Sequence, residues 1–256
     1  MPHASLSALV VAHNEEEMLP GCLESLAFAD EIVVVLDRCT DGTRAVAQRY
    51  GARLLEGAWP IEGDRRNAGI DACIGDWILE VDADERVPPA LAAEVRQVLE
   101  GADTGYFGVP FDNYIGGRLV RHGWGAYNGV QESSRLFARG CKRWGRQEVH
   151  PKLELRGAKR LLQARMTHLV DRDIFDMIDR LNRNSSSAAR QAVAAGERLR
   201  LGGALRRIFS RFYKSFVARR GYREGTYGLA LGLFSALYPL LTYLKAEELR
   251  RRGSGN

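Results

Sequence analysis

Four acidic residues cluster at the end of the apolar run "WILEVDADERVPP": Glu80, Asp82, Asp84 and Glu85. Clustered carboxylates repel one another, so such a cluster must be solvated, paired with bases or neutralised by a cation. Asp82 and Asp84 are two residues apart, and carboxylate oxygens bind Mg²⁺ or Mn²⁺ together with phosphate oxygens of a substrate. The pair therefore predicts a divalent-metal site, although an acidic pair at a strand end can also be merely solvated.

The elements that position this cluster alternate between strand and helix patterns. Short apolar runs predict strands, and segments with helical spacing and terminal capping residues predict the helices between them. The strands are expected at 6–12, 31–37, 52–57 and 76–82, and the helices at 15–29, 40–51 and 63–75. This alternation predicts an α/β fold with a mainly parallel sheet and helices on both faces.

Polar side chains follow three of the expected strands. His13, Asn14 and Glu15 follow the first, Asp37 and Arg38 the second, and Asp82 and Asp84 the fourth. In such sheets ligands bind beyond the carboxyl ends of the strands, so these residues predict one cleft. No Gly-x-Gly-x-x-Gly follows the first strand and no Walker loop is present, which excludes the usual phosphate loops. A phosphate group would instead need a metal held by Asp82 and Asp84.

Composition narrows the class of protein. The chain has 256 residues, 45% of them apolar, which is ordinary for a globular protein. Its four cysteines are far apart in sequence and form no Cys-x-x-Cys pair, so a zinc site or a disulfide framework is not expected. A reduced, cytoplasmic location fits this usage, and the N-terminus has no signal-peptide pattern.

Four sequence blocks in order resemble those of the inverting glycosyltransferases of family 2, which have the GT-A fold. The blocks are "VVAHNEEEMLPGCLESL", "DEIVVVLDRCTDGT", "RRNAGIDACIGDWILEVDADERVPP" and "SSRLFARG". Within the family the chain is most similar to small bacterial enzymes of lipopolysaccharide core assembly. The resemblance covers roughly residues 5 to 150 and weakens beyond about residue 155. It implies a metal-dependent enzyme that moves a sugar from a nucleotide-diphosphate donor, with Mg²⁺ or Mn²⁺ as the cofactor.

The resemblance also implies roles for individual residues on the nucleotide side. Ala12 and Glu15 would line the nucleotide pocket, and Asp37 would hydrogen-bond the base, expected to be uracil. The chain departs from the family pattern here, because many relatives have an acidic residue and a glycine–serine pair where this chain has Leu36 and Arg38-Cys39. Arg38 could therefore reach a phosphate or point to solvent.

On the phosphate side, the resemblance places Arg66 near the donor phosphates. Asp82 would touch the ribose or the metal, and Asp84 would coordinate the metal that bridges the diphosphate. A metal in this position offsets the charge that builds up on the departing nucleotide diphosphate.

The catalytic base is harder to assign. An inverting transferase needs a base that deprotonates the attacking hydroxyl, and the similar enzymes carry a glutamate after a Val-His pair. Here Pro151 follows His150, so Glu148 or His150 is the candidate. The alternative is that Glu148 only pairs with Arg146 or Lys152. Trp124, Tyr127 and Arg135 are expected on the acceptor side, although such aromatic residues are as often part of a core.

The C-terminal third differs in composition. The stretch 205–223 carries seven basic residues and no acid, with aromatic residues at helical spacing, and 226–244 contains no charge. A basic amphipathic helix followed by an apolar helix suits an anionic membrane surface. We expect a monotopic or re-entrant helix; a true span, packing on the catalytic domain and a homodimer contact are the alternatives. Nucleic acid is disfavoured because of the long apolar run.

Together these features predict a catalytic domain over 1–155 and a helical, membrane-associating region over 156–256. The expected location is the cytoplasmic face of the bacterial inner membrane, and the expected acceptor is a lipid-linked or lipopolysaccharide-core glycan. Two other functions stay open. One is a non-catalytic membrane scaffold on a degenerate transferase fold, and the other is a nucleotidyltransferase, although its glycine-rich basic loop is not visible.

Overall fold

A computed structural model of the chain describes residues 4–123, 132–146 and 152–253. The chain forms two compact units, and each combines two stretches of sequence. The first unit is Met1–Phe111 with Val130–His168, and the second is Asp112–Gly129 with Leu169–Asn256. The units are therefore interleaved along the chain, whereas the sequence prediction places a single boundary at residue 155.

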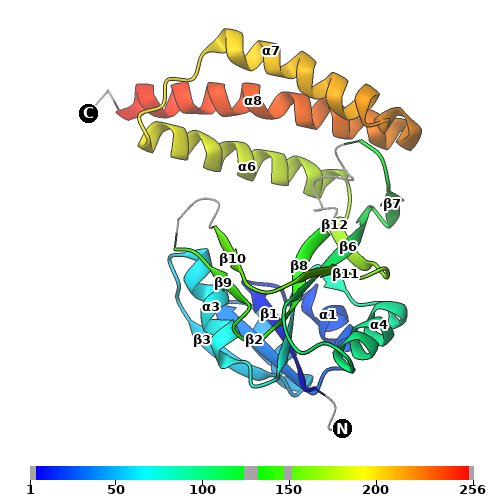
Figure 1. The fold of residues 1–256 in the computed structure, drawn as a ribbon. Helices are drawn as coiled ribbons and strands as arrows, with labels where there is room; N and C mark the ends of the chain where they lie inside the picture. The colour runs from blue at the N-terminus through cyan, green and yellow to red at the C-terminus, as the bar shows by residue number, and fades with distance from the viewer. Residues whose placement is uncertain (1–3, 124–131, 147–151, 254–256) are drawn as a thin grey trace. The chain divides into compact units, whose positions relative to one another are not determined.

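The first unit contains the predicted α/β sheet. Its parallel part has the order β3-β2-β1-β4, so the chain starts in the middle of this part and builds outwards (Figure 1). The strands are β1 (Leu6–Ala12), β2 (Glu31–Asp37), β3 (Arg53–Gly57) and β4 (Trp77–Asp82), and the intervening helices are α1 (Leu19–Ser25), α2 (Thr43–Arg49) and α3 (Glu62–Ala72). The fold class predicted from the alternation is confirmed.

Burial on both faces explains why these strands are so uniformly apolar. Val33, Val34 and Val35 are fully buried in succession, as expected where helices cover both faces of a parallel sheet. Helix α3 comes unusually close to the sheet at Gly69, where a Cβ atom would lie 2.6 Å from Leu9 Cδ1. A glycine at this point lets α3, which carries Arg65 and Arg66, pack directly on the strands.

Antiparallel strands extend the sheet beyond β4. The order continues β4-β8-β6-β12-β5, with β7 and β11 pairing with β6, and β9 and β10 forming a separate two-stranded sheet. The bounds are β5 (Glu85–Arg86), α4 (Pro89–Leu99), β6 (Tyr106–Ile115), β7 (Arg118–Val120), β8 (Glu132–Ala138), β9 (Lys142–Trp144), β10 (Leu153–Leu155), β11 (Lys159–Leu161) and β12 (Met166–Asp171). Residues 159–171, expected in the helical region, thus form strands, because β11 and β12 complete the sheet beside β6 and β5.

The second unit is dominated by helices. It contains α6 (Ile174–Ala194), α7 (Leu201–Phe212), a π-helical turn (Tyr213–Ala218), a 3₁₀ turn (Gly221–Glu224) and α8 (Gly225–Gly253). Figure 1 shows α8 between α6 and α7, and it packs against both. The segment Gly221–Arg252 is long and apolar enough to cross a membrane by length and composition.

A small core joins these helices to the hairpin of the same unit. Ile115 of β6 and Val120 of β7 are buried together with Met177 of α6 and Leu231 of α8. The turn after β7 is held by Glu224, whose carboxylate accepts hydrogen bonds from the backbone N–H groups of Arg121 and His122, both at 3.0 Å. The C-terminal helices therefore complete the fold of residues 112–123.

Candidate active site

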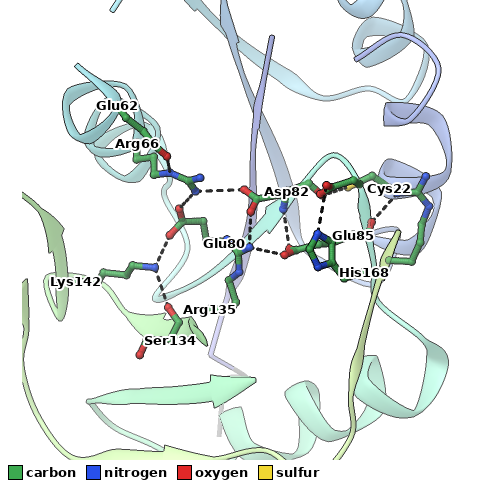
Figure 2. A network of polar contacts seen from close by, with 12 residues as sticks. Cys22, Glu62, Arg66, Glu80, Asp82, Glu85, Ser134, Arg135, Lys142 and His168 are labelled. Atoms are coloured by element: carbon green, nitrogen blue, oxygen red, sulfur yellow. Dashed lines mark hydrogen bonds and ion pairs between the residues drawn. The ribbon is translucent and has the colours of Figure 1, made fainter. Parts of the chain in front are cut away.

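The candidate site starts at the carboxyl end of β4. Glu80 and Asp82 are two residues apart on this strand, so their side chains point to the same face of the sheet. Glu80 is fully buried, and its carboxylate accepts hydrogen bonds from Arg66 of α3 and, at 2.5 Å, from Lys142 Nζ of β9. Figure 2 shows both cations reaching this carboxylate from different elements.

Asp82 and Glu85 share a third cation. Arg135 of β8 donates to both carboxylates through Nη2, and Arg66 lies 3.3 Å from Asp82 (Figure 2). The backbone N–H of Asp82 also donates to Glu85 Oε2 at 2.8 Å. Three acids, Glu80, Asp82 and Glu85, are thus matched by three bases, Arg66, Arg135 and Lys142, so the protein itself neutralises most of the carboxylate cluster.

The pKa values follow from this pairing. Burial alone would raise the pKa of Glu80, but the charges of Lys142 and Arg66 lower it to about 2. Burial also opposes ionisation of Asp82, yet Arg135 and Arg66 hold its pKa below the usual value. Burial dominates at Glu85 and raises its pKa despite Arg135. Since buried charges are tolerated only when paired, each member of this network depends on the others.

Arg66 was predicted to approach the donor phosphates. In the structure its guanidinium lies over the Trp144 ring, with 5.0 Å from Cζ to the ring centroid, and donates to Glu62 at 3.0 Å as well as to Glu80 and Asp82. Arg66 lies beside Asp82, and its place near the donor phosphates stays a prediction. Its hydrogen bonds show that it also holds the β4 carboxylates in place.

Asp84 is the acid of the cluster that stands outside the three-cation network. It lies in the turn between β4 and β5, its side chain is 40% exposed, and Oδ2 is 3.3 Å from Nε2 of His168 on β12. Burial would lower the pKa of His168, but the hydrogen bond and charge of Asp84 raise it above the usual value. A carboxylate and an imidazole side by side could both ligate one divalent ion.

The metal prediction can be compared with these ligands. Asp82 faces two arginines, whereas Asp84 faces an imidazole. That Asp82 and Asp84 together hold the metal stays a prediction. Among residues 4–123, 132–146 and 152–253, no three His, Cys, Asp or Glu side chains are grouped to hold a metal by themselves. The remaining ligands would therefore have to come from phosphate oxygens or water, as is common for Mg²⁺ in nucleotide sites.

The nucleotide side lies at the ends of β1 and β2. Ala12 is buried, and the backbone N–H of Glu15 donates to Thr43 Oγ1 at 2.7 Å. Asp37 is buried and accepts four hydrogen bonds: two from Arg38 at 2.8 and 2.9 Å, one from Arg65 at 3.0 Å and one from the backbone N–H of Trp59 at 3.1 Å. These four bonds fill the acceptor capacity of a carboxylate. A contact with a base would require one of them to be exchanged.

Four predicted residues, Trp124, Tyr127, Glu148 and His150, lie outside the described residues. Arg135, predicted on the acceptor side, contacts Asp82 and Glu85 and stacks over Phe111. The sequence reasoning missed Lys142 and His168. Each lies on a strand far along the chain from β4, Lys142 on β9 of the two-stranded sheet and His168 on β12 of the main sheet, so no local spacing marks either of them.

The family assignment can be tested directly. The model of the glycosyl transferase family 2 domain matches residues 7–152, which is more than half of the chain. The chain belongs to this family. The matched residues include β1 to β4, α3 and the β4 carboxylate cluster, and the resemblance inferred from the four sequence blocks is confirmed.

Two curated relatives align with nearly the whole chain. The lipopolysaccharide core biosynthesis glycosyltransferase LpsC of Rhizobium meliloti (strain 1021) is 28% identical, over 97% of this chain and 94% of its own length. An uncharacterized glycosyltransferase of Rickettsia felis is 22% identical, over 96% of this chain and 89% of its own length. The similarity thus extends beyond the family domain into the C-terminal helices.

Solved structures match over a shorter stretch. A glucosyl-3-phosphoglycerate synthase from Mycobacterium tuberculosis, in complex with Mn²⁺, uridine diphosphate and glucosyl-3-phosphoglycerate, is 24% identical with a TM-score of 0.35. The match covers 41% of this chain and 43% of that one. A mannosyl-3-phosphoglycerate synthase from Rubrobacter xylanophilus gives a TM-score of 0.38 and covers 43% of this chain and 41% of its own. This chain therefore matches less than half of each of these enzymes.

Proposed function

We propose that this family 2 glycosyltransferase moves a sugar from a nucleotide-diphosphate donor to a lipid-linked or lipopolysaccharide-core glycan, with inversion at the anomeric carbon. The observation that carries the proposal is the pair of Asp84 and His168 beside three other acids, Glu80, Asp82 and Glu85, that Arg66, Arg135 and Lys142 neutralise. The near full-length similarity to a lipopolysaccharide core glycosyltransferase supports the acceptor class.

Donor binding would use the ends of β1 and β2 and the end of β4. Ala12 and Glu15 would line the nucleotide pocket, and Asp37 would contact the base directly or through Arg38, which is half exposed and bound to it. A uracil base remains the prediction, because its N3–H would compete with Arg38 or Arg65 for the Asp37 carboxylate. Asp82, fixed by Arg66 and Arg135, would face the ribose.

A divalent ion would be held by Asp84 and His168, with Asp82 nearby. When bound, such an ion stabilises negative charge on the leaving diphosphate as a Lewis acid. The mixed oxygen and nitrogen ligand set favours Mn²⁺ over Mg²⁺, which prefers oxygen ligands alone. The residues of the network keep Asp84 positioned, because Asp82 and Glu85 on either side of it are fixed by Arg135.

The decisive variant for the proposed function is Asp84→Ala. Sugar transfer, followed as release of nucleoside diphosphate from a panel of nucleotide sugars, should disappear, and Mn²⁺ affinity measured by calorimetry should fall. The melting temperature should stay close to that of the wild type because the side chain is partly exposed. Asp71→Ala is the matched control, since Asp71 is a 57% exposed acid of the same unit. Wild-type turnover in Asp84→Ala, or in excess chelator, would disprove the metal role.

The base remains Glu148, with His150 two residues away. On a strand, residues 148 and 150 would point to the same face, and the histidine would then orient the carboxylate or the acceptor hydroxyl. Trp124, Tyr127 and Arg135 would line the acceptor side, where Arg135 also holds Asp82. Because a positioned base contributes about 10²–10⁴-fold to rate, Glu148→Gln should reduce turnover by that order and leave donor affinity unchanged. If turnover stays above about a tenth of wild type, the base lies elsewhere.

The location proposed for the enzyme is the cytoplasmic face of the bacterial inner membrane, with peripheral attachment through the C-terminal helices. The long apolar helix α8 and the basic residues of α7 support this attachment. A homodimer contact through the same helices is the alternative partner. Membrane attachment would place the enzyme where lipid-linked acceptors are made.

A non-catalytic membrane scaffold is the second candidate function. Two observations favour it: Pro151 stands where relatives carry the base, and the Asp37 carboxylate has all four acceptor positions filled. Slow hydrolysis of any nucleotide sugar by the purified wild type, abolished in Asp84→Ala, would reject the scaffold. Binding of glycolipid without turnover of any donor would support it.

A further inference from the structure

Helix α7 and the π-helical turn after it carry an exposed apolar stripe. Five residues at intervals of four make up this stripe, so each lies about one turn beyond the one before it. Their exposed fractions range from 43% to 77%: Leu201 45%, Leu205 43%, Phe209 77%, Tyr213 62% and Val217 45%. Contiguous exposed apolar side chains on a folded unit indicate a binding surface rather than an ordinary solvated face.

Helix α8 adds a second stripe beside it. Leu229, Leu233 and Leu237 follow one another at intervals of four, and Leu244 continues the same side two turns later. Their exposed fractions lie between 40% and 50%. The helices are neighbours, because Phe212 and Phe216 next to the α7 stripe pack against α8 at Gly232. We call these two stripes, together with the exposed cations Arg206, Arg207, Lys214, Arg220 and Arg223, the α7–α8 face.

The charges around the α7 stripe and the turns after it have one sign. Five exposed basic residues flank the stripes: Arg206, Arg207, Lys214, Arg220 and Arg223. The only acid in the sequence from Leu201 to Gly228 is Glu224, which is buried and bound to the backbone of Arg121 and His122. From Leu201 to Gly228 the α7–α8 face therefore combines apolar side chains with unbalanced positive charge. A second copy of the same face would meet it with like charge, whereas an anionic lipid surface matches both properties.

The packing of α8 argues against a membrane span. Lys245 of α8 donates hydrogen bonds to Asn182 Oδ1 at 2.7 Å, to Ser185 Oγ at 2.8 Å and to Ser186 Oγ at 2.9 Å, all on α6. Helix α6 carries ionisable residues along its length, among them Asp176, Asp179, Arg180, Arg183 and Arg190. A spanning α8 would have to take this charged helix into the hydrocarbon region or lose these contacts, and either is costly.

We propose that the α7–α8 face lies in the plane of an anionic lipid surface, with its apolar stripes at the headgroup boundary and its cations on lipid phosphates. This rests on the membrane attachment proposed above, and it adds which residues contact the lipid, which lipid charge they bind and how the helices lie. Helix α8 then binds the membrane by one side only, while its other sides hold α6 and α7.

Two phenylalanines with equal exposure provide the test. Phe209 on α7 is 77% exposed among cations, and Phe175 on α6 is 78% exposed beside Asp173, Asp176 and Asp179. The full-length protein is sedimented with phosphatidylcholine vesicles with and without phosphatidylglycerol. Wild type should bind only the anionic vesicles, Phe209→Ser should bind them about tenfold or more weakly, and Phe175→Ser should bind like wild type. Equal losses for the two variants, or wild-type binding by Phe209→Ser, would overturn the proposal.

Charge and salt separate the in-plane geometry from its alternatives. Arg206→Gln and Arg207→Gln should each weaken binding to the anionic vesicles about fivefold. High salt should release the protein, because surface attraction is screened whereas a spanning helix stays in the membrane. Retention in high salt would show a span. A dimer in solution that Phe209→Ser dissociates would instead assign the face to a second copy.

The outcome is independent of the transfer reaction. Donor hydrolysis by Phe209→Ser should equal that of wild type, and Asp84→Ala should still bind the vesicles. Loss of donor chemistry in wild type with normal vesicle binding would reject the proposed transfer and leave the α7–α8 face standing. Normal donor chemistry in a wild type that does not bind vesicles would reject only the lipid-binding role of the α7–α8 face.

Discussion

Charged side chains are arranged differently in the carboxylate network (Glu80, Asp82 and Glu85 with Arg66, Arg135 and Lys142) and on the α7–α8 face. In the network three acids, Glu80, Asp82 and Glu85, meet three bases, Arg66, Arg135 and Lys142, and the protein satisfies most of its own charges. On the α7–α8 face five cations are exposed with no exposed acid near them in sequence. Charge that is paired internally holds a structure in place, whereas charge left for solvent is available to an external partner. Within the carboxylate cluster, Asp84 lies outside the three-cation network and is 40% exposed, so its charge is the one that an external ligand could use.

The largest expected effect comes from removing one charge of the network. Lys142→Met leaves Glu80 buried with less compensation, and breaking a buried pair in this way costs about 3–5 kcal/mol of the free energy of unfolding. Urea unfolding measures it. The double variant Lys142→Met/Glu80→Leu should recover a large part of the loss. A single variant as stable as wild type would mean that Glu80 is not held as a charged group.

The next effect tests whether the C-terminal helices are an appendage or part of a fold. Leu231 of α8 is buried against Ile115 and Val120, so Leu231→Ala should lower the free energy of unfolding by about 3 kcal/mol. Leu233→Ala, two residues away and 47% exposed, is the control and should change it by less than about 0.5 kcal/mol. Equal effects of the two variants would show that α8 is not packed on the hairpin.

A smaller effect is expected at Glu224. Glu224→Gln keeps the shape of the side chain but removes the charge that binds two backbone N–H groups and His122, at a cost of about 2 kcal/mol. Hydrogen exchange should speed up at the amides of Arg121 and His122. Glu248→Gln makes the same change on the exposed side of α8 and should leave both readings unaltered. If hydrogen exchange at these two amides is the same in Glu224→Gln as in wild type, the Glu224 carboxylate does not hold this turn.

The smallest effect on stability is expected from Lys214→Met, the same substitution as in the network but on the α7–α8 face. Lys214 is exposed, so the free energy of unfolding should stay within about 0.5 kcal/mol of wild type. Binding to anionic vesicles should nevertheless weaken about fivefold. If Lys214→Met lowered the free energy of unfolding as much as Lys142→Met, the two lysines would not differ in the way proposed.

The sequence predicts the parallel half of the sheet well because its signals are local. The apolar runs of β1, β2 and β4 and the polar residues after them are readable in windows of a few residues, and so are Asp82 and Asp84. The neutralising cations are not readable in this way. Arg135 and Lys142 reach the acids only because β8 inserts antiparallel between β4 and β6 and β9 follows it. Pairing across long sequence separations leaves no periodic signal in either partner.

In the basic stretch 205–223, too, the sequence predicts the local structure but not the part that depends on distant contacts. Its helical spacing predicts one amphipathic helix, and α7 confirms the first part of it. The chain then passes through a π-helical and a 3₁₀ turn, with Arg220 at a φ of 57°. This turn is set by contacts that spacing cannot reveal: a Cβ atom on Gly123 would lie 3.0 Å from Gly221 Cα, and one on Gly228 would lie 1.8 Å from Gly221 O.

The interleaving of the two units has a consequence for biosynthesis. Ile115 and Val120 leave the ribosome early, but Leu231, which buries them, follows roughly a hundred residues later. At a translation rate of about 5–20 residues per second, these side chains wait roughly 5–20 s for their partner. During that interval the nascent hairpin presents apolar surface to solvent, so a chaperone that binds short apolar segments should engage the chain between the completion of β7 and the arrival of α8.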